Sequence, residues 1–564
     1  MAGASAAAGQ TSAQLTSDGC DLTAASWCAG NGRVPFVLKI GVTGHRRLAN
    51  LARTAEAVTE AVRLIRGLIP KGTHEVVVVA ISALAEGADR IVVRELLSEP
   101  GSRLHVALPL PPGEYARDFE TAASKEEFDT LLTQASHVWQ APELPDREAA
   151  YEQAGWYVID ECDVLIALWD GEPSRGRGGT AEIVARAREQ GVPLVWIRTS
   201  GEPTVVREFD GERIKMLREA ARDLNEYNSG LIPDTLFTAQ AHFQLGSLGL
   251  TTDTRPFDGP LNHACEQVAG WLVPFFVRAD VLALRLQGRF RLLSTAMFAM
   301  AAAAVSVVAI QASFWPGQNW VAGFEVLLLL LLLGIPLFGN RSRLYERWTA
   351  YRFLAERLRS AYFLALTGTG DRIQRAGSQA SFSDPSVAWI ERALAEVMAG
   401  RPRLELDACD VQQLRGYLSG YWIGGQVSYH VKAAERHREW DTRLRRTTAA
   451  LFGITLICAV LHLLGVADDG ARPSSLAALL IVLAICVPAV GAAVHGIETQ
   501  RQYRRHSQRF SRMVTLLKQL ARRMDEAEDL QQVQLIAANV EQVMREESND
   551  WFGVMRFHDI ELIT

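Results

Sequence analysis

Three glycine-bearing segments in the N-terminal half of the chain combine residue types that suit phosphate binding. They are KIGVTGHR at Lys39–Arg46, SALAEGADR at Ser82–Arg90 and GRGGTAE at Gly176–Glu182. Each follows an apolar run and precedes a helical pattern, so backbone N–H groups and the positive end of a helix would meet at one point and stabilise a phosphate. Any one of these turns could be only a tight connection. Together, at three strand ends, they predict a nucleotide cleft in an open parallel sheet.

The segments that must position these turns alternate between strand and helix patterns. Expected strands cover residues 37–42, 76–81, 104–108, 164–169 and 194–197, and expected helices cover residues 49–68, 87–97, 149–162 and 180–189. Short loops between them imply βα units with right-handed crossovers. The sequence therefore predicts an α/β Rossmann-like domain over residues 35–273. Residues 1–34 are rich in Ala, Ser, Thr and Gly, and we expect them to be disordered.

The C-terminal half has the composition of a membrane protein. Four segments, residues 292–312, 321–338, 447–467 and 475–497, are each near the ~20 apolar residues that cross a bilayer. Basic residues flank the segments, whereas the short loops inside the two hairpins are nearly free of them, so the positive-inside rule places both termini in the cytoplasm. We expect an all-α transmembrane domain with four spans and long cytoplasmic helices, in the cell (inner) membrane.

The two apolar hairpins look like copies of one unit. GRFRLLSTAMF at Gly288–Phe298 is similar to DTRLRRTTAALF at Asp441–Phe452, and each hairpin is followed by a basic helix with apolar residues at spacings of three and four. We assign the first unit to residues 274–400 and the second to residues 401–564. Each membrane helix is expected to continue inward as a coiled-coil-like stalk. The apolar stripes either hold the bundle together or transmit a movement from the N-terminal domain.

Composition and motifs argue against several function classes. The formal net charge of −6 gives no reason to expect a nucleic-acid partner, and seven scattered cysteines without a C-x-x-C pair fit a reduced compartment. No metal-ligand spacing, G-x-x-x-x-G-K-[ST] or G-x-S-x-G motif occurs, so we expect no metal. Glu325, His462 and His495 lie within expected spans, either as functional groups or as side chains hydrogen-bonded between helices. Arg278 and Asp280 could pair with each other, with the N-terminal domain or with water.

Four motifs carry a resemblance to a known superfamily. GVTGHR at Gly41–Arg46, ALAEGADR at Ala83–Arg90, LPLPPGEYARDF at Leu108–Phe119 and GGT at Gly178–Thr180 together resemble the SLOG superfamily over about residues 35–270. This Rossmann-like group contains the LOG phosphoribohydrolases, the DNA-processing protein A fold and the N-terminal domain of melastatin-type TRP channels.

The two hairpin units resemble the SLATT group, whose members are membrane effector domains that occur beside SLOG sensors in bacterial conflict systems. That second resemblance depends on layout and on fragments such as QVSYH at Gln426–His430.

The SLOG resemblance implies binding of a nucleotide or an ADP-ribose-like ligand at the carboxyl ends of the strands, with no further cofactor. On this resemblance Arg90 either lies in the cleft or pairs with Asp89, and Asp170 or Glu182 holds ribose hydroxyls. The implied ligand-binding residues are Gly41, Thr43, Gly44, His45, Arg46, Ser82, Glu86, Gly87, Asp89, Arg90, Asp170, Gly178, Gly179, Thr180 and Glu182.

The glycine motif GRGGTAE at Gly176–Glu182 departs from the pattern of the LOG enzymes, which read PGGxGTxxE. The leading proline and one glycine are absent here, and Glu182 stands two residues after Thr180 rather than three. Hydrolysis needs a carboxylate beside the scissile bond, and a one-residue slip turns a helical side chain by about 100°. Glu182 remains the candidate catalytic residue, but the departure favours binding without catalysis.

The combined expectation is a sensor of a nucleotide-derived signal coupled to a membrane-permeabilising, channel-like effector in bacterial antiviral defence. The signal must bind one membrane arrangement better than the other, and the pore would come from a homo-oligomer. The alternative is a membrane-anchored LOG-type nucleotide hydrolase or N-glycosidase. A transporter or scaffold without ligand chemistry is the third possibility.

Overall fold

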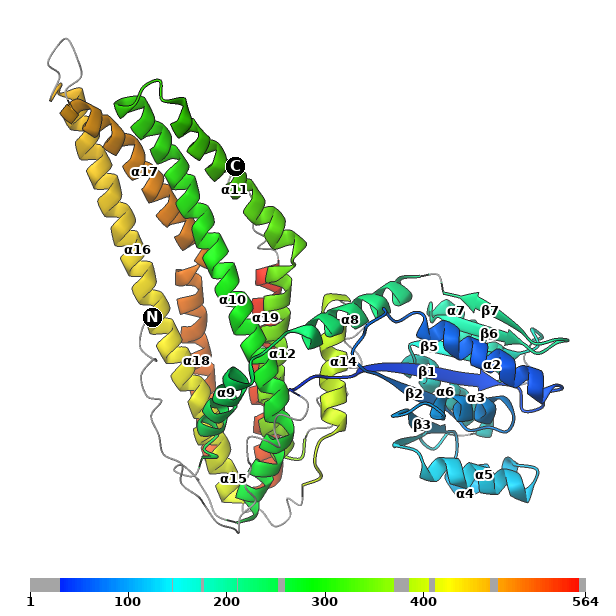
Figure 1. The fold of residues 1–564 in the computed structure, drawn as a ribbon. Coiled ribbons are helices and arrows are strands. Elements are labelled where there is room, and N and C mark those ends of the chain that lie inside the picture. The colour runs from blue at the N-terminus through cyan, green and yellow to red at the C-terminus, as the bar shows by residue number, and fades with distance from the viewer. Residues whose placement is uncertain are drawn as a thin grey trace, which may run out of the picture.

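The computed structural model describes residues 31–144, 146–173, 177–209, 211–251, 259–369, 385–404, 411–466 and 475–556. It contains an α/β domain around one sheet and a bundle of long helices (Figure 1). Residues 1–30 of the segment expected to be disordered lie outside the described residues. At the end of that segment Val34 is buried and exchanges two hydrogen bonds, of 3.1 and 2.7 Å, with the side-chain amide of Asn228.

Seven strands form one sheet in the order β4-β3-β2-β1-β5-β6-β7. Strands β1 to β6 pair in parallel, and β7 pairs with β6 in the antiparallel direction. The strands are β1 Phe36–Gly44, β2 Val76–Ser82, β3 Arg103–Leu108, β4 His137–Gln140, β5 Val164–Trp169, β6 Leu194–Arg198 and β7 Thr204–Glu208. The expected α/β Rossmann-like class is confirmed, and each of the five expected strands lies within an observed one.

Helices cover both faces of this sheet because both faces are apolar. Leu38 and Ile40 pack with α2 and α3 on one face, and Val77 and Val79 pack with α6 and α7 on the other. The helices of this domain are α2 Leu51–Arg66, α3 Ala88–Leu97, α4 Pro112–Tyr115, α5 Ala122–Thr133, α6 Arg147–Glu161 and α7 Thr180–Glu189. The expected helices correspond to α2, α3, α6 and α7.

Two strands and two helices of the domain were not expected from the sequence. Strand β4 is four residues long and mostly exposed, so it has no apolar run, and β7 returns beside β6 after a short loop. Helix α5 has only two buried side chains, and α4 is a single turn. Helix α2 begins at Leu51 rather than residue 49 because the Asn50 side chain caps it, accepting from the Arg53 N–H at 3.2 Å.

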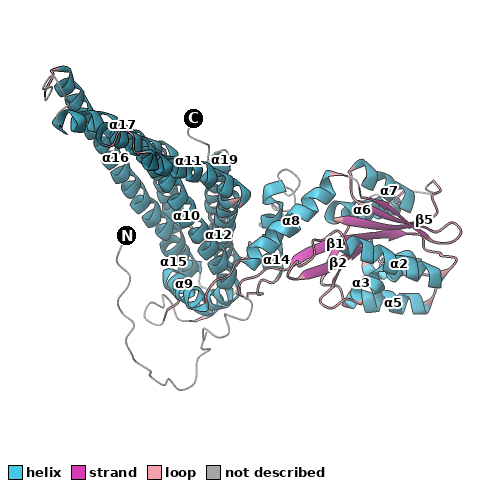
Figure 2. Cartoon of the chain, turned by 45° about the horizontal axis from the view of Figure 1, so that its top comes forward, coloured by secondary structure: helices cyan, strands magenta, loops and turns pink. Residues whose placement is uncertain are grey.

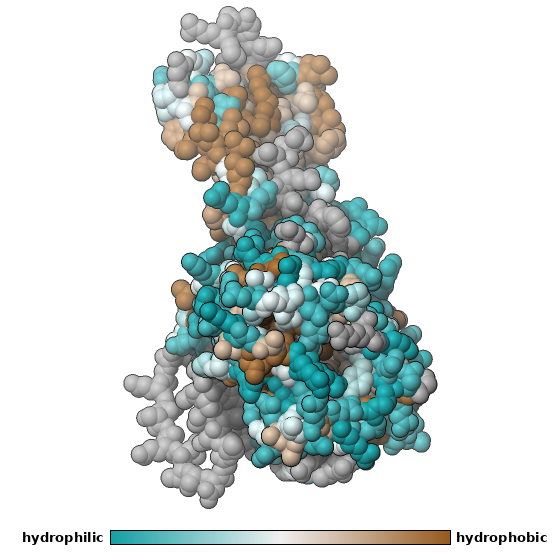
Figure 3. Space-filling model, turned by 90° about the vertical axis from the view of Figure 1, so that its right-hand side faces the viewer, coloured by the Kyte–Doolittle hydropathy of each residue, from teal (hydrophilic) through white to brown (hydrophobic). Residues whose placement is uncertain are grey.

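Within the described residues, the helical part contains four helices that are long and apolar enough to cross a membrane, in α10, α11, α16 and α17. The helices are α8 Glu212–Ser229, α9 Asp234–Ser247, α10 Pro260–Phe314, α11 Asn319–Arg341, α12 Leu344–Leu366, α14 Pro385–Ala399, α15 Val411–Tyr417, a π-helical segment Leu418–Gly424, α16 Gly425–Leu463, α17 Ser475–Arg501, α18 Tyr503–Glu526 and α19 Leu530–Arg556. Figure 3 shows apolar side chains gathered at one end of the molecule and hydrophilic ones over the α/β domain.

The two helices of each hairpin continue inward in different ways. The first helix is unbroken, since α10 has 55 residues and α16 has 39. The second helix breaks after the span, at Arg343 between α11 and α12 and at Gln502 between α17 and α18, both in the left-handed conformation with φ of 47° and 43°. That conformation interrupts the regular helix. The expected continuous stalks are therefore wrong for the second helix of each unit, although both units share the same break.

Buried charges join α10 to α8 and to α12. The Arg278 guanidinium, on α10, donates to the carbonyl oxygens of Tyr227, Asn228 and Gly230 at 2.6 to 2.9 Å, which caps the C-terminal end of α8. Asp280 instead pairs with Arg352 of α12 at 3.1 Å. The two residues thus do not pair with each other: Arg278 binds the end of α8, and Asp280 binds α12.

Helix α14 lies between the sheet and the bundle (Figure 2). Arg392 of α14 donates two hydrogen bonds to the carboxylate of Asp163, the residue before β5, one of them at 2.9 Å. Glu396 of α14 forms a two-point ion pair with Arg103, the first residue of β3, at 2.7 and 2.9 Å. Helix α14 therefore docks on the edge of the sheet where the parallel strands begin.

Candidate functional site

A cavity of about 590 Å³ opens at the opposite edge, where the parallel strands end. The cavity lies beside β1, where the strand order reverses: β2, β3 and β4 follow on one side of β1, and β5 and β6 follow on the other. Open α/β sheets bind ligands at such switch points. The lining residues on which the site depends are Thr43, Gly44, His45 and Arg46 after β1, Ala83, Ala85 and Asp89 after β2, Asp170 after β5, Gly178, Gly179 and Thr180 at α7, and Tyr115 and Tyr151.

Two glycines allow the first two loops to touch. A Cβ on Gly44 would lie 2.4 Å from the Cβ of Ala88, and a Cβ on Gly87 would lie 2.1 Å from the carbonyl oxygen of Arg46. Gly87 also has φ of +81°, which side chains rarely adopt. The Ala88 N–H donates to the His45 carbonyl at 3.1 Å, so the start of α3 is fixed against the end of β1. Gly41 lies deeper in β1, against Cys162.

His45 and Asp170 connect the loops after β1 and β5. The Nε2 atom of His45 lies 3.0 Å from Oδ1 of Asp170 and 3.2 Å from its backbone nitrogen. The backbone N–H of Glu172, at 3.0 Å from Oδ1, lowers the pKa of Asp170, and His45 acts in the same direction. Asp170 is therefore ionised at neutral pH and faces the cavity beside a histidine.

The third loop brings the start of α7 to the cavity. Gly178 has φ of +75°, and a Cβ there would lie 2.7 Å from the backbone nitrogen of Glu152. Its N–H donates to Oε2 of Glu182 at 2.7 Å, so the Glu182 carboxylate caps the loop, and Glu182 is not among the residues that line the cavity. Thr180 is the first residue of α7. The N–H groups of Glu182 and Ile183 donate to the Gly179 carbonyl at 3.0 and 3.2 Å, which leaves those of Thr180 and Ala181 to bind an anion.

The second loop contributes a buried carboxyl group. Asp89 is only 4% exposed and accepts a hydrogen bond of 2.8 Å from the Ser82 hydroxyl, which itself accepts from the Leu84 N–H. Burial raises the pKa of Asp89 to about 6. A carboxyl group in this environment can exchange a proton near neutral pH. Ser82 positions Asp89 and does not itself line the cavity.

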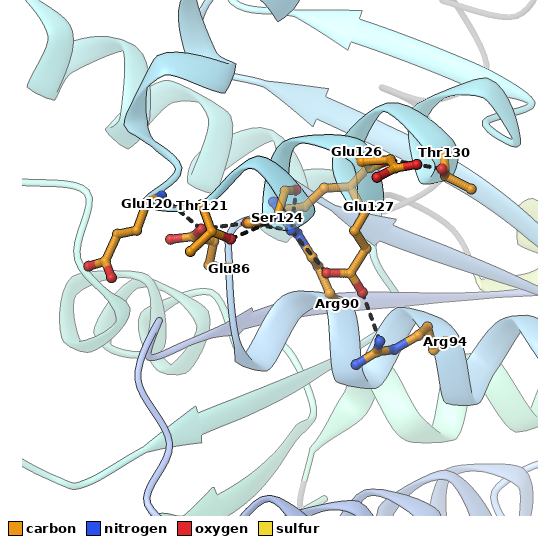
Figure 4. A network of polar contacts seen from close by, with 10 residues as sticks. Glu86, Arg90, Arg94, Glu120, Thr121, Ser124, Glu126, Glu127 and Thr130 are labelled. Carbon is orange, nitrogen blue, oxygen red and sulfur yellow. Dashed lines mark hydrogen bonds and ion pairs between the residues drawn. The ribbon is translucent and has the colours of Figure 1, made fainter.

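Two predicted site residues face away from the cavity, in the contact between α3 and α5 (Figure 4). Arg90 is buried and donates to the hydroxyl and carbonyl oxygens of Ser124, both at 2.8 Å, and to Glu127 at 3.0 Å. Glu86 accepts from the Ser124 hydroxyl at 2.5 Å. Arg90 was expected either to lie in the cleft or to pair with Asp89, and both expectations are wrong because it pairs with Glu127 of α5. Both residues hold the second loop in place rather than lining the cavity.

Tyr115 lines the cavity and was not among the predicted site residues. Its side chain is fully buried, and its hydroxyl has no hydrogen-bond partner among the described residues. Phe119, Phe128 and Tyr151 surround the ring at centroid distances of 5.0 to 5.8 Å. Only its place inside the third SLOG-like motif, LPLPPGEYARDF, could have indicated it.

Tyr151 and Arg46 complete the polar wall. The Tyr151 hydroxyl donates to Asp118, which also accepts two hydrogen bonds from Arg147 at 2.7 and 2.9 Å. The exposed guanidinium of Arg46 lies 5.9 Å from the centroid of the Tyr151 ring. Among the described residues, no group of three or more His, Cys, Asp or Glu side chains could hold a metal ion. The wall thus offers N–H groups, two phenols, three guanidinium groups (Arg46, Arg47 and Arg177) and three carboxyl groups (Asp89, Asp170 and Glu172) to a small polar ligand.

The helical part of the chain matches a family of known proteins. Residues 422–551, which span the end of the π-helical segment, α16, α17, α18 and most of α19, match the family model SLATT_1, described as SMODS and SLOG-associating 2TM effector domain 1. A search of curated proteins found no match. With its four apolar helices, the chain is a membrane protein whose second hairpin unit is similar to the SLATT effector domains.

Proposed function

We propose that the α/β domain is a sensor for a phosphorylated, nucleotide-derived signal and that signal binding changes the arrangement of the membrane helices. The observation that carries the proposal is the cavity at the switch point, where the start of α7, Arg46 and the unpaired hydroxyl of Tyr115 converge. The family description of residues 422–551 names an effector domain that associates with SLOG, which supports the same pairing within one chain.

The cavity suits a nucleotide in both size and chemistry. About 590 Å³ lies within the usual range for small-molecule sites. The phosphate would lie between Thr43, Gly44 and the first turn of α7, because N–H groups and a helix N-terminus favour negative charge. The carboxylate of Asp170 is available to ribose hydroxyls, and the ring of Tyr151 offers a face to a base.

Helix α6 provides a direct route from the cavity to the bundle. Its first half lines the cavity through Tyr151, Ala154 and Gly155. Its last residue, Glu161, lies two positions before Asp163, which holds Arg392 of α14. Helix α14 packs on both α8 and α12. A ligand that shifts α6 would therefore move the contact that joins the sheet to the inner helices.

The effector step is permeabilisation of the cell membrane by an oligomer of this chain, in bacterial antiviral defence. A ligand can drive such a change only if it binds one membrane arrangement better than the other. Two hairpin units with long inner helices give the signal a mechanical connection to all four apolar helices, which an anchor alone would not need.

The test is the thermal stability of the full chain in detergent against a panel of nucleotides, cyclic oligonucleotides and ADP-ribose derivatives. A true ligand at hundredfold excess should stabilise the protein by roughly 2.7 kcal/mol. Arg46→Gln should lose that stabilisation. Arg53→Gln, an exposed α2 residue paired with Glu56 and absent from the cavity wall, should keep it. No stabilisation by any compound would contradict the sensor.

A membrane-anchored hydrolase is the second candidate, and one observation favours it: Asp89 lines the cavity with a pKa of about 6, suitable for a general acid or base. Glu182, the predicted catalytic residue, is instead hydrogen-bonded to Gly178. Mass spectrometry of the recovered ligand separates the two functions. An unmodified ligand supports the sensor, and a cleaved ligand whose cleavage is abolished by Asp89→Asn or Glu182→Gln supports the hydrolase.

A further inference from the structure

Three arginines from three helices come together at the end of the spans nearest the α/β domain. Arg501, the last residue of α17, donates to the hydroxyl of Thr295 on α10 at 2.7 Å and to the carbonyl of Arg291 at 3.4 Å. Burial, followed by the charges of Arg501 and of Arg436 on α16, lowers the pKa of Arg291. Contacts place Arg436 here as well: the ring of its neighbour His437 lies 5.5 Å from that of Tyr503, whose hydroxyl accepts from Arg501 at 3.4 Å. The three guanidinium groups are therefore close enough to repel one another.

No described carboxylate offsets this charge. None of the three arginines forms an ion pair among the described residues, and the phenols of Tyr429 and Tyr503 also lie near Arg291. Of the acidic side chains on α16 and α17 near these arginines, Glu439 lies 3.5 Å from Arg443 and Glu498 lies 3.5 Å from His495. Glu435, which precedes Arg436, is exposed and forms no ion pair with the three arginines among the described residues. Like charges held together without a counter-charge are unfavourable. An anion placed between them would turn the repulsion into attraction.

Beside the three arginines, the ring of His437 on α16 packs against that of Tyr503 at 5.5 Å, and its buried Nδ1 has no described partner. A neutral imidazole with a free ring nitrogen can donate or accept a hydrogen bond at such a site.

The position of the cluster identifies the kind of anion. Arg291 immediately precedes Leu292, which is 69% exposed at the start of the apolar part of α10. This is the depth at which lipid headgroups meet the hydrocarbon, and basic residues there attract anionic lipids. A guanidinium fork matches the oxygens of a phosphate group better than an ammonium does, and all three residues are arginine.

We propose that Arg291, Arg436 and Arg501 form a binding site for the headgroup phosphate of an anionic phospholipid. The lipid bridges α10, α16 and α17, so it joins the first hairpin unit to the second at the membrane surface. This site is separate from the cavity of the α/β domain, and it does not depend on the identity of any signal.

The experiment compares thermal unfolding of the full chain in detergent with added phosphatidylglycerol, phosphatidylcholine or inorganic phosphate. The test variant is Arg291→Gln/Arg436→Gln, which leaves Arg501 and its bond to Thr295 intact. The matched control is Arg445→Gln/Arg446→Gln, which removes two exposed charges from the corresponding position of the second unit. Phosphatidylglycerol should stabilise the wild type and the control, and its apparent affinity should be roughly thirtyfold weaker for the test variant.

Each other outcome overturns the proposal. Equal weakening in the two double variants would mean a general attraction to basic flanks, and equal stabilisation by phosphatidylcholine would mean that only the acyl chains matter. Stabilisation by inorganic phosphate alone at the same concentration would mean a soluble anion site. If the glutamine variant fails to fold, Arg291→Lys/Arg436→Lys replaces it, because lysine keeps the positive charge but lacks the two-point hydrogen bonding of a guanidinium group. Phosphatidylglycerol binding unchanged in that variant would also overturn the proposal.

Discussion

At the scale of single residues, the unpaired hydroxyl of Tyr115 is expected to contribute to ligand binding but not to the stability of the fold. A buried hydroxyl without a partner carries the cost of its lost hydration, so a residue whose only role was packing would be better as phenylalanine. The Tyr115 side chain lies in the cavity wall, where a ligand atom could supply the missing partner.

We expect Tyr115→Phe to leave the free energy of unfolding unchanged or to raise it by about 1 kcal/mol, because no intramolecular hydrogen bond is lost. Ligand affinity should fall roughly tenfold, which titration calorimetry can measure. Tyr157→Phe is the control, since Tyr157 stacks on Trp139 at 4.2 Å outside the cavity. Unchanged ligand affinity in Tyr115→Phe would place the hydroxyl outside the binding site.

Asp89 makes stability depend on pH. Its pKa of about 6 in the folded protein exceeds the ordinary value of about 3.9, so the folded state binds the proton more tightly than the unfolded state. Its contribution to the free energy of unfolding therefore decreases as pH rises from about 4 to about 6, by about 3 kcal/mol in all.

Asp89→Asn should remove that decrease while still accepting the Ser82 hydrogen bond. Melting temperatures of both proteins between about pH 4 and pH 7 test this, and the difference between them is the relevant quantity. Burial lowers the pKa values of the buried His430 and of the half-buried His437 and His506 to about 4. These histidines give the opposite slope in both proteins, so their effect cancels in the difference. Parallel curves for the two proteins would refute the assignment.

At the scale of elements, the contact between the end of β1 and the start of α3 shapes the cavity. Gly87 precedes α3 with φ of +81° and faces the carbonyl oxygen of Arg46. The helix can approach the strand this closely only because Gly87 has no side chain to separate them.

Gly87→Ala should lower the free energy of unfolding by about 3 kcal/mol or more and weaken ligand binding, because it adds a steric clash to backbone strain. Gly101→Ala is the matched control: its φ is +76°, but no atom lies within 4 Å of the position that the added methyl group would take. That change should cost only the strain, about 1–2 kcal/mol, and leave ligand binding intact. Chemical denaturation measures the loss of stability in both variants, and calorimetry measures ligand binding. An equal loss of stability in Gly87→Ala and Gly101→Ala would mean that the close contact between Gly87 and the Arg46 carbonyl is not needed.

At the scale of the whole molecule, the cavity and the bundle lie at opposite edges of one sheet. Helix α6 extends between them, and the Asp163–Arg392 contact connects its far end to α14. The Asp163 side chain is only 9% exposed, so its carboxylate is largely shielded from water.

We expect Asp163→Asn to retain ligand affinity but to reduce ligand-induced dye release from liposomes roughly tenfold, since coupling between sites is commonly worth about 1–3 kcal/mol. Glu161→Gln is the control, because Glu161 pairs with Lys39 at 2.7 Å within the α/β domain. Dye release that is the same in both variants would show that the signal takes another route.

The sequence alone determined the parts of this protein that depend on local order. Apolar runs located five of the seven strands and all four membrane-length helices, and the glycine turns located the loops around the cavity. Apolar periodicity and glycine conformation act within a few residues, so they can be read along the chain. Short edge strands such as β4, with exposed side chains, leave no such pattern.

Only the tertiary structure decided which side chains meet. It places Arg90 and Glu86 against α5, bonds the Glu182 carboxylate to the Gly178 N–H, and puts Tyr115 in the cavity wall. It also joined Asp163 to Arg392 across 229 residues. Such contacts depend on strand order and helix packing, since neighbours in space are not neighbours in the chain, and no local pattern encodes them.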